Sequence, residues 1–137
     1  MTNEKIAFFL RMVKFGIVGT SGIFVNQCVL VLCVKIFNID YKIGSLMAIE
    51  TAIITNFLLN YNLTFGDRKR KDVKSKAAAF LKFNATSFAT AFLLNWGTLV
   101  FLTEVAHIKY WISNLAGIFV AAAVNFCVSN FWVFKKN

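Results

Sequence analysis

Residues 15–37 read FGIVGTSGIFVNQCVLVLCVKIF, and Lys35 is the only charged residue in this stretch. A helix rises ~1.5 Å per residue, so about 20 apolar residues cross the ~30 Å hydrocarbon core of a bilayer. The stretch therefore predicts a membrane-spanning helix. Three more apolar stretches of similar length follow, at residues 43–65, 83–103 and 110–134. We predict an all-α integral membrane protein with four transmembrane helices.

The composition of the whole chain agrees with this interpretation. Of its 137 residues, 58% are hydrophobic and none is proline, and the mean hydropathy is +0.66. A soluble domain of this size has more polar residues with which to cover its surface. Residues 1–14 carry charges on both sides of a short apolar patch and no cleavage pattern, which predicts an interfacial lead-in rather than a signal peptide.

Residues that could carry chemistry are sparse. Cys28, Cys33 and Cys127 all lie inside predicted spans, and their odd number favours buried thiols over disulfides or a metal site. His107 is the only histidine. We therefore expect no metal, no cofactor and no catalytic constellation. The chain is not expected to be an enzyme.

The basic residues predict the orientation, because lysine and arginine near span ends are retained on the cytoplasmic side. Of the 15 basic residues, 12 lie in the N-terminal segment, in the 66–82 connection and at the C-terminus. Both termini and the central connection are thus predicted to be cytosolic, in a multi-pass protein of the cytoplasmic membrane. The net charge of +9 is explained by this topology and by anionic lipid headgroups, so we expect no nucleic-acid binding.

The sequence also contains an internal repeat. At a separation of 69 residues Asn26 matches Asn95, and Asn56-Phe57 matches Asn125-Phe126. At the cytosolic entrances the match shifts by one residue, where Lys14-Phe15 corresponds to Lys82-Phe83. We predict one membrane domain over residues 1–137. It consists of two parallel helical hairpins at about 9–65 and 80–135, joined by a basic loop at 66–79.

Polar residues inside the predicted spans are the first candidates for function, because lipid exposure of such groups is costly. The candidates for a polar interior are Asn26, Asn56, Asn60, Asn95, Asn125 and Ser129. Their helical spacing gives each span one small and polar face. Two interpretations stay open: these faces pack against each other through interhelical hydrogen bonds, or they line a route for hydroxyl-rich cargo.

Charged residues give a second set of candidates. Glu50 is expected ~22 Å from the cytosolic end of its span, as a proton or cation site, a counter-ion for Lys35, a group at the mouth of a cavity or a paired interfacial carboxylate. Arg11, Lys14 and Lys82 lie at the entrances of the first and third spans. Such a cation cluster could hold a lipid phosphate, although ordinary anchoring at the cytosolic face also explains each residue.

Four segments together carry a family resemblance: KFGIVGTSG at 14–22, NFLLNYNLTF at 56–65, FLKFNATS at 80–87 and NFCVSNFWVF at 125–134. Over about residues 9–135 the chain resembles the GtrA-like family, four-span proteins of surface-polysaccharide synthesis. Family members often carry arginine where this chain has Tyr61 and Asn130. A phosphate-binding role of those arginines therefore does not transfer to this chain.

The resemblance implies that the protein flips a polyprenyl-phosphate-linked monosaccharide across the membrane, for use by a glycosyltransferase on the other side. A first alternative is a non-catalytic membrane anchor that recruits a glycosyltransferase. A second is a small proton-coupled exporter that uses Glu50. Because four short helices enclose little volume, a homo-oligomer is also plausible.

Overall fold

The computed structural model describes residues 2–69 and 71–135, without the side chains of residues 41, 42, 45, 110 and 111. The described residues are helical or lie in turns, and none of them forms a strand. This confirms the all-α prediction. The chain divides into two compact units, Met1–Lys69 and Arg70–Asn137.

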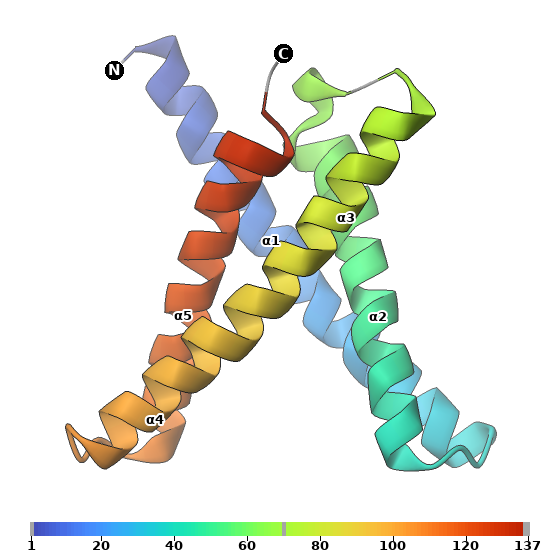
Figure 1. The fold of residues 1–137 in the computed structure, drawn as a ribbon, viewed down its shortest axis with the longest axis vertical. Helices are drawn as coiled ribbons and strands as arrows, with labels where there is room; N and C mark the ends of the chain where they lie inside the picture. Colours follow the sequence, from blue (N-terminus) through green and yellow to red (C-terminus); the bar gives the residue numbers. More distant parts are fainter. Residues whose placement is uncertain (1, 70, 136–137) are drawn as a thin grey trace. The chain divides into compact units, whose positions relative to one another are not determined.

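Unit 1 is a pair of long helices. Helix α1 (Asn3–Val31) continues into a π-helical turn η1 (Leu32–Ile36), and α2 (Tyr41–Leu59) continues into a second π-helical turn η2 (Asn60–Thr64). A short 3₁₀ turn, η3 (Gly66–Arg68), follows. Figure 1 shows α1 and α2 in blue and green, joined by a short turn. Helices α1 and α2 pack against each other, and the start of α1 also meets η2.

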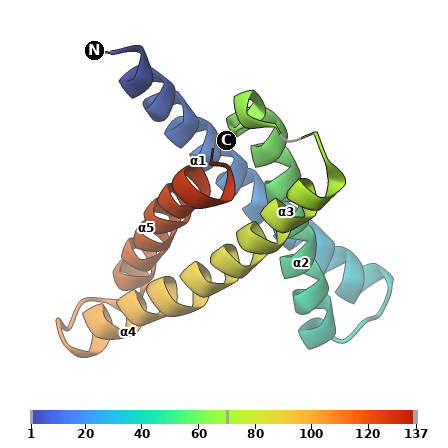
Figure 2. The ribbon, with the colours of Figure 1, turned by 45° about the horizontal axis from the view of Figure 1, so that its top comes forward.

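Unit 2 is built in the same way from a longer and a shorter helical segment. Helix α3 (Val73–Ala89), the π-helix η4 (Thr90–Trp96) and α4 (Gly97–Glu104) follow one another without a break. Helix α5 (Tyr110–Val128) continues into η5 (Ser129–Val133). Figure 2 shows α5 running back along the segment formed by η4 and α4, which it contacts.

The turn of each unit has the same backbone geometry. Asn38 and His107 adopt left-handed conformations with φ angles of 52° and 54°. In unit 1, the amide of Ile39 donates to the Cys33 carbonyl at 2.9 Å; in unit 2, the amide of Ile108 donates to the Leu102 carbonyl at 3.0 Å. A left-handed residue after a helix turns the chain so that the last carbonyls find donors. Asparagine and histidine are among the residues that tolerate this conformation.

Three helical segments are long and apolar enough to cross a membrane among the described residues: Asn3–Ile36, Val73–Glu104 and Ile112–Val133. The remaining predicted span, at residues 43–65, corresponds to α2 and η2, which carry Glu50 and several asparagines. That span remains a prediction. Many large apolar side chains point outward, and Ile17, Phe24 and Phe119 are 65%, 70% and 75% exposed. Outward apolar side chains are what a lipid environment requires.

Helix α1 includes the segment expected as an interfacial lead-in and is helical from Asn3 without interruption. One predicted boundary differs from the structure. The expected loop at 66–79 is shorter, because α3 begins at Val73. The Asp72 side chain caps α3 by accepting a hydrogen bond from the Ser75 amide at 2.8 Å. Asp72 and the alanines at 77–79 favour helix here in spite of the high charge.

Candidate functional site

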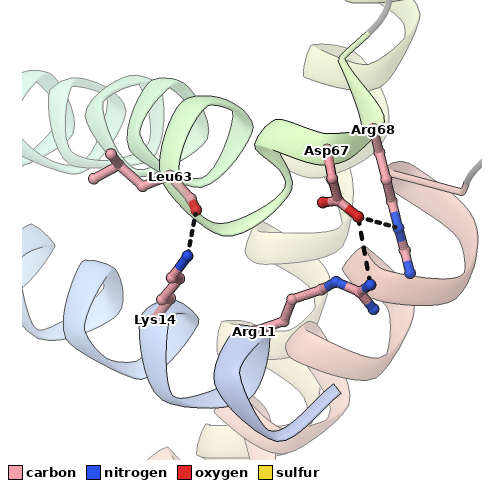
Figure 3. Close-up of polar contacts among 5 residues, drawn as sticks. All are labelled: Arg11, Lys14, Leu63, Asp67 and Arg68. Carbon is pink, nitrogen blue, oxygen red and sulfur yellow. Dashed lines mark hydrogen bonds and ion pairs between the residues drawn. The ribbon is translucent and has the colours of Figure 1, made fainter. Parts of the chain in front are cut away.

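A cleft of about 340 Å³ lies in unit 1 between the first turns of α1 and the end of α2. Its lining combines apolar side chains with two cations and one carboxylate: Ala7, Leu10, Arg11, Lys14, Leu63, Thr64, Gly66 and Asp67. Figure 3 shows that the side chains of Arg11 and Lys14 extend from α1 towards the chain that follows α2. Two of the three cations predicted from the sequence therefore lie in one cleft.

Lys14 joins the two helices of unit 1 at the edge of this cleft. Its Nζ donates to the Leu63 carbonyl at 3.4 Å (Figure 3). Leu63 lies in the last turn of its helix, where carbonyl groups lack partners within the helix and carry partial negative charge. An ammonium group has three N–H donors, so this single long contact leaves donors for a ligand.

Arg11 belongs to a short chain of charges. Its Nη2 lies 3.4 Å from Oδ2 of Asp67, and Nε of Arg68 lies 4.0 Å from the same oxygen (Figure 3). The side chains of Arg11 and Arg68 are 18% and 13% exposed, whereas that of Asp67 is 54% exposed. Burial and the neighbouring Arg11 cation lower the pKa of Arg68, and Asp67 opposes this effect. Two cations thus contact one carboxylate. The cleft lining itself carries two cations, Arg11 and Lys14, and one carboxylate, Asp67, so its net charge is positive.

Lys82, the third predicted cation, has a different environment in unit 2. Its Nζ lies 4.8 Å from the centre of the Trp132 ring, which is a cation–π contact. Trp132 lies in η5, the last helical turn of this unit. Lys82 thus also joins the two helices of its unit, but through an aromatic ring rather than a carbonyl oxygen.

The predicted polar interior lies largely at helix contacts within each unit. Asn56 of α2 faces the backbone of Gly22 in α1, and Asn95 of η4 faces Gly117 in α5. Nδ2 of Asn125 donates to Oγ of Ser87 at 3.4 Å. These contacts fit the packing interpretation of Asn56, Asn95 and Asn125.

The deepest polar residues lie at the ends of the helices. Asn60 and Ser129 are 1% and 0% exposed, and Asn60 Oδ1 accepts a hydrogen bond from Thr64 at 2.7 Å. Asn26 is partly exposed. Four of the predicted residues have a buried oxygen without a hydrogen-bond partner among the described residues: Oδ1 of Asn56, Asn95 and Asn125 and Oγ of Ser129. Buried oxygens of this kind retain capacity for a donor, so the cargo interpretation also stays open.

The outer candidates are accessible rather than buried. Glu50 of α2 and Lys35 of η1 both have exposed side chains.

Sequence reasoning missed three participants in the site, which are Asp67, the carbonyl of Leu63 and the ring of Trp132. Arg68 belongs to the basic connection at 66–82 that the sequence already singled out. Asp67 is the only acidic residue between Phe65 and Lys71, and this isolated carboxylate within a basic run was the available signal. A sequence pattern does not predict which backbone carbonyl a lysine such as Lys14 contacts.

Comparison with known proteins agrees with the resemblance. The sequence model of the GtrA/DPMS transmembrane domain matches residues 14–134. The chain therefore belongs to the GtrA/DPMS transmembrane-domain family and is a membrane protein. A dolichol-phosphate mannosyltransferase of Pyrococcus furiosus is 37% identical over 122 residues, which make up 87% of this chain and 32% of that relative. The chain thus spans about a third of this relative's length.

Proposed function

We propose that this protein moves a polyprenyl-phosphate-linked monosaccharide across the cytoplasmic membrane. The observation that carries the proposal is the positively charged cleft of unit 1, where Arg11 and Lys14 stand beside apolar side chains at the end of a membrane-spanning helix. A lipid phosphate combines an anionic headgroup with an apolar chain, and this cleft offers a surface for each part. The name of the relative, a dolichol-phosphate mannosyltransferase, supports the same class of lipid.

The proposed topology is four spans in two parallel hairpins, with both termini in the cytosol. Matching contacts inside the two units support a duplicated hairpin. Phe15 packs on Phe65 at a ring distance of 6.4 Å, and Phe83 packs on Phe134 at 6.0 Å. The turns at Asn38 and His107 also share one pattern of backbone hydrogen bonds. Each hairpin would begin and end on the basic, cytosolic side.

In the proposed mechanism the lipid tail stays in the bilayer, so only the phosphate and the sugar need a polar route. Arg11 and Lys14 bind the phosphate by charge-assisted hydrogen bonds. The sugar hydroxyls then meet the amide and hydroxyl groups of the polar residues inside the spans, and Glu50 and Lys35 contact the sugar near the outer mouth. The sugar-binding set is Asn26, Asn56, Asn60, Asn95, Asn125 and Ser129. The chain itself makes and breaks no covalent bond.

The test is a flipping assay in proteoliposomes. A fluorescent short-chain polyprenyl-phosphate sugar is incorporated, and an external reductant measures the fraction that reaches the outer leaflet. Arg11→Gln and Lys14→Gln should slow transfer by about tenfold or more, because each removes a charge-assisted contact. Lys5→Gln is the matched control, since Lys5 is exposed in the same helix and does not line the cleft. Wild-type transfer no faster than in empty liposomes would refute the proposal.

Asn56→Leu and Asn125→Leu test the sugar-binding part separately. Both variants remove an amide whose oxygen is buried without a partner among the described residues. Unaltered flipping in both would remove these asparagines from the transport route and leave them with a packing role.

A second candidate function is that of a membrane anchor for a glycosyltransferase. It is supported by the relative, of which this chain matches only 32%. Under this alternative the protein would co-purify with a glycosyltransferase encoded by the same organism and would show no transfer in proteoliposomes. Both results together would favour the anchor over the flippase.

A further inference from the structure

We propose that each chain holds one phosphate group, in unit 1 only, and that Lys82 has become a structural residue of unit 2. This inference rests on the proposed function, because it concerns the same class of ligand. The sequence repeat by itself suggests two equivalent cation sites. The side-chain contacts distinguish them.

Lys14 and Lys82 hold the same position in their units. Each precedes a buried phenylalanine, Phe15 or Phe83, and each phenylalanine packs on the aromatic residue that ends its hairpin. Each lysine also contacts the same position of the last helical turn, which is Leu63 in unit 1 and Trp132 in unit 2, 69 residues apart. The two lysines are therefore equivalent in position, and differences in their contacts reflect differences between the two units.

In unit 1 the position supports anion binding. Lys14 is exposed, makes one 3.4 Å contact with a carbonyl, and lines the cleft together with Arg11. Two cations one helical turn apart can grip a phosphate from the same face of α1. Thr64 also lines the cleft, but its buried hydroxyl donates to Asn60 Oδ1, so the two cations are the phosphate-binding groups.

In unit 2 each of these features is replaced. Arg11 corresponds to Ala79, which is 1% exposed, and Thr64 corresponds to Val133, which is 0% exposed. The Lys82 ammonium lies over the indole of Trp132, a ring that attracts cations and repels anions at its face. Of the two cations that line the cleft of unit 1, only Lys14 has a cationic counterpart here, Lys82, and its ammonium group is already engaged with an aromatic ring. The second copy has thus exchanged a ligand contact for an internal one.

The experiment counts bound ligands. The full chain, purified in detergent, is titrated with farnesyl phosphate and examined by native mass spectrometry and calorimetry. We expect one farnesyl phosphate per chain. Lys14→Gln should weaken binding by about tenfold or more. Lys82→Gln should leave affinity and stoichiometry unchanged while lowering the unfolding temperature, because a cation–π contact is lost.

Trp132→Leu is the second variant, in case Lys82→Gln does not fold. It gives unit 2 the residue that unit 1 has at this position and leaves Lys82 in place. One ligand per chain is again expected, because Ala79 provides no second cation. Two ligands per wild-type chain, or equal weakening by Lys14→Gln and Lys82→Gln, would overturn the inference and leave the proposed function intact.

Inorganic phosphate separates headgroup recognition from insertion of the farnesyl chain into the detergent belt. Displacement of farnesyl phosphate by inorganic phosphate, with the same dependence on Lys14, would support recognition of the phosphate group. If the wild-type chain binds neither probe, or if Arg11→Gln and Lys14→Gln bind like the wild type, the anion site fails altogether. The proposed function would then fall together with this inference.

Discussion

The amide of Asn56 in α2 lies directly against the backbone of Gly22 in α1. A Cβ atom on residue 22 would lie 2.5 Å from both Oδ1 and Nδ2 of Asn56. In unit 2 the roles of the two helices are exchanged, because Gly117 of α5 faces Asn95 of the preceding segment. A Cβ on residue 117 would lie 2.5 Å from the backbone oxygen of Asn95. Each hairpin thus has one glycine that allows an asparagine to approach.

Gly117→Ala should therefore destabilise the protein by about 1–3 kcal/mol, the usual cost of overpacking. Gly22→Ala should cost less, since it meets a side-chain amide that can rotate rather than a backbone carbonyl. The measurement is the free energy of unfolding in mixed micelles as sodium dodecyl sulfate is increased. Gly97→Ala and Gly19→Ala are the controls, because a Cβ at either position meets nothing within 4 Å. Equal effects at all four positions would contradict the close approach.

Asp67 is expected to compete with a phosphate for Arg11. Asp67→Asn should raise the affinity for farnesyl phosphate by up to about fivefold, the range that corresponds to an exposed ion pair. The effect should disappear in the Arg11→Gln background, because Asp67 would act through its 3.4 Å contact with that residue. Calorimetric titration of the wild type, the two single variants and the double variant measures the coupling between Asp67 and Arg11.

Glu4→Gln is the matched control for Asp67→Asn, since it removes the same charge from an exposed position outside the cleft. A comparable gain in affinity from Glu4→Gln would mean that Asp67 acts only through the general charge of this end of the protein. If Asp67→Asn still raises the affinity in the Arg11→Gln background, Asp67 likewise does not act through its contact with Arg11.

The turns of the hairpins offer a test of backbone strain. His107 has a φ of 54°, a conformation that costs residues with a Cβ about 1–2 kcal/mol. His107→Gly should stabilise the protein by up to about 1 kcal/mol, and Asn38→Gly by less, because asparagine tolerates this conformation better. Thermal unfolding in detergent measures both. Ala106→Gly, in the same turn but without a positive φ, should give no gain.

The π-helix η4 offers an explanation for the one-residue shift within the repeat. Its hydrogen bonds run from residue i to i+5, so a π-helical turn holds one residue more than an α-helical turn. The matched positions are 68 residues apart at Lys82 and 69 apart at Asn95, and η4 begins between them at Thr90. The corresponding part of α1 is α-helical. With the extra residue in η4, both Lys82 and Asn95 keep their side chains directed towards the second helix of unit 2.

Deletion of Leu93 should therefore convert η4 into a regular α-helix and be tolerated, since Leu93 is 64% exposed and its neighbours keep their orientation. Deletion of Phe119, which is 75% exposed but lies in the α-helical part of α5, should unfold the protein or lower its unfolding temperature far more. The deletion rotates all following residues of α5 by ~100° and would move Phe126 out of its buried position. Similar losses from both deletions would argue against this account of η4.

The sequence predicts the helices well but their ends less well. Hydropathy and the absence of proline suffice to predict the long helical segments. The lead-in at Asn3 and the start of α3 at Val73 escape hydropathy, because amphipathic or charged turns extend the helices beyond the apolar core. The Asp72 cap, with Ser75 three residues later, is a signal that a closer inspection of helix starts would have found.

The candidate site is predictable only in part. Charge clustering picks out Arg11, Lys14 and Lys82 as one group. It does not separate Lys14 on a carbonyl from Lys82 on an indole ring, because that difference depends on which residue of the other helix faces each lysine. Local patterns describe single helices, whereas partners across a hairpin depend on packing.

The division of the chain at Lys69–Arg70 has a consequence for biogenesis. Because the turn, the ring pair and the charged contacts described for unit 1 all lie within Met1–Lys69, that unit can finish packing before the ribosome has completed the second hairpin. A nick in the backbone after Lys69 would cut none of these contacts. Two co-expressed fragments, cut after Lys69, should then rebuild a working protein.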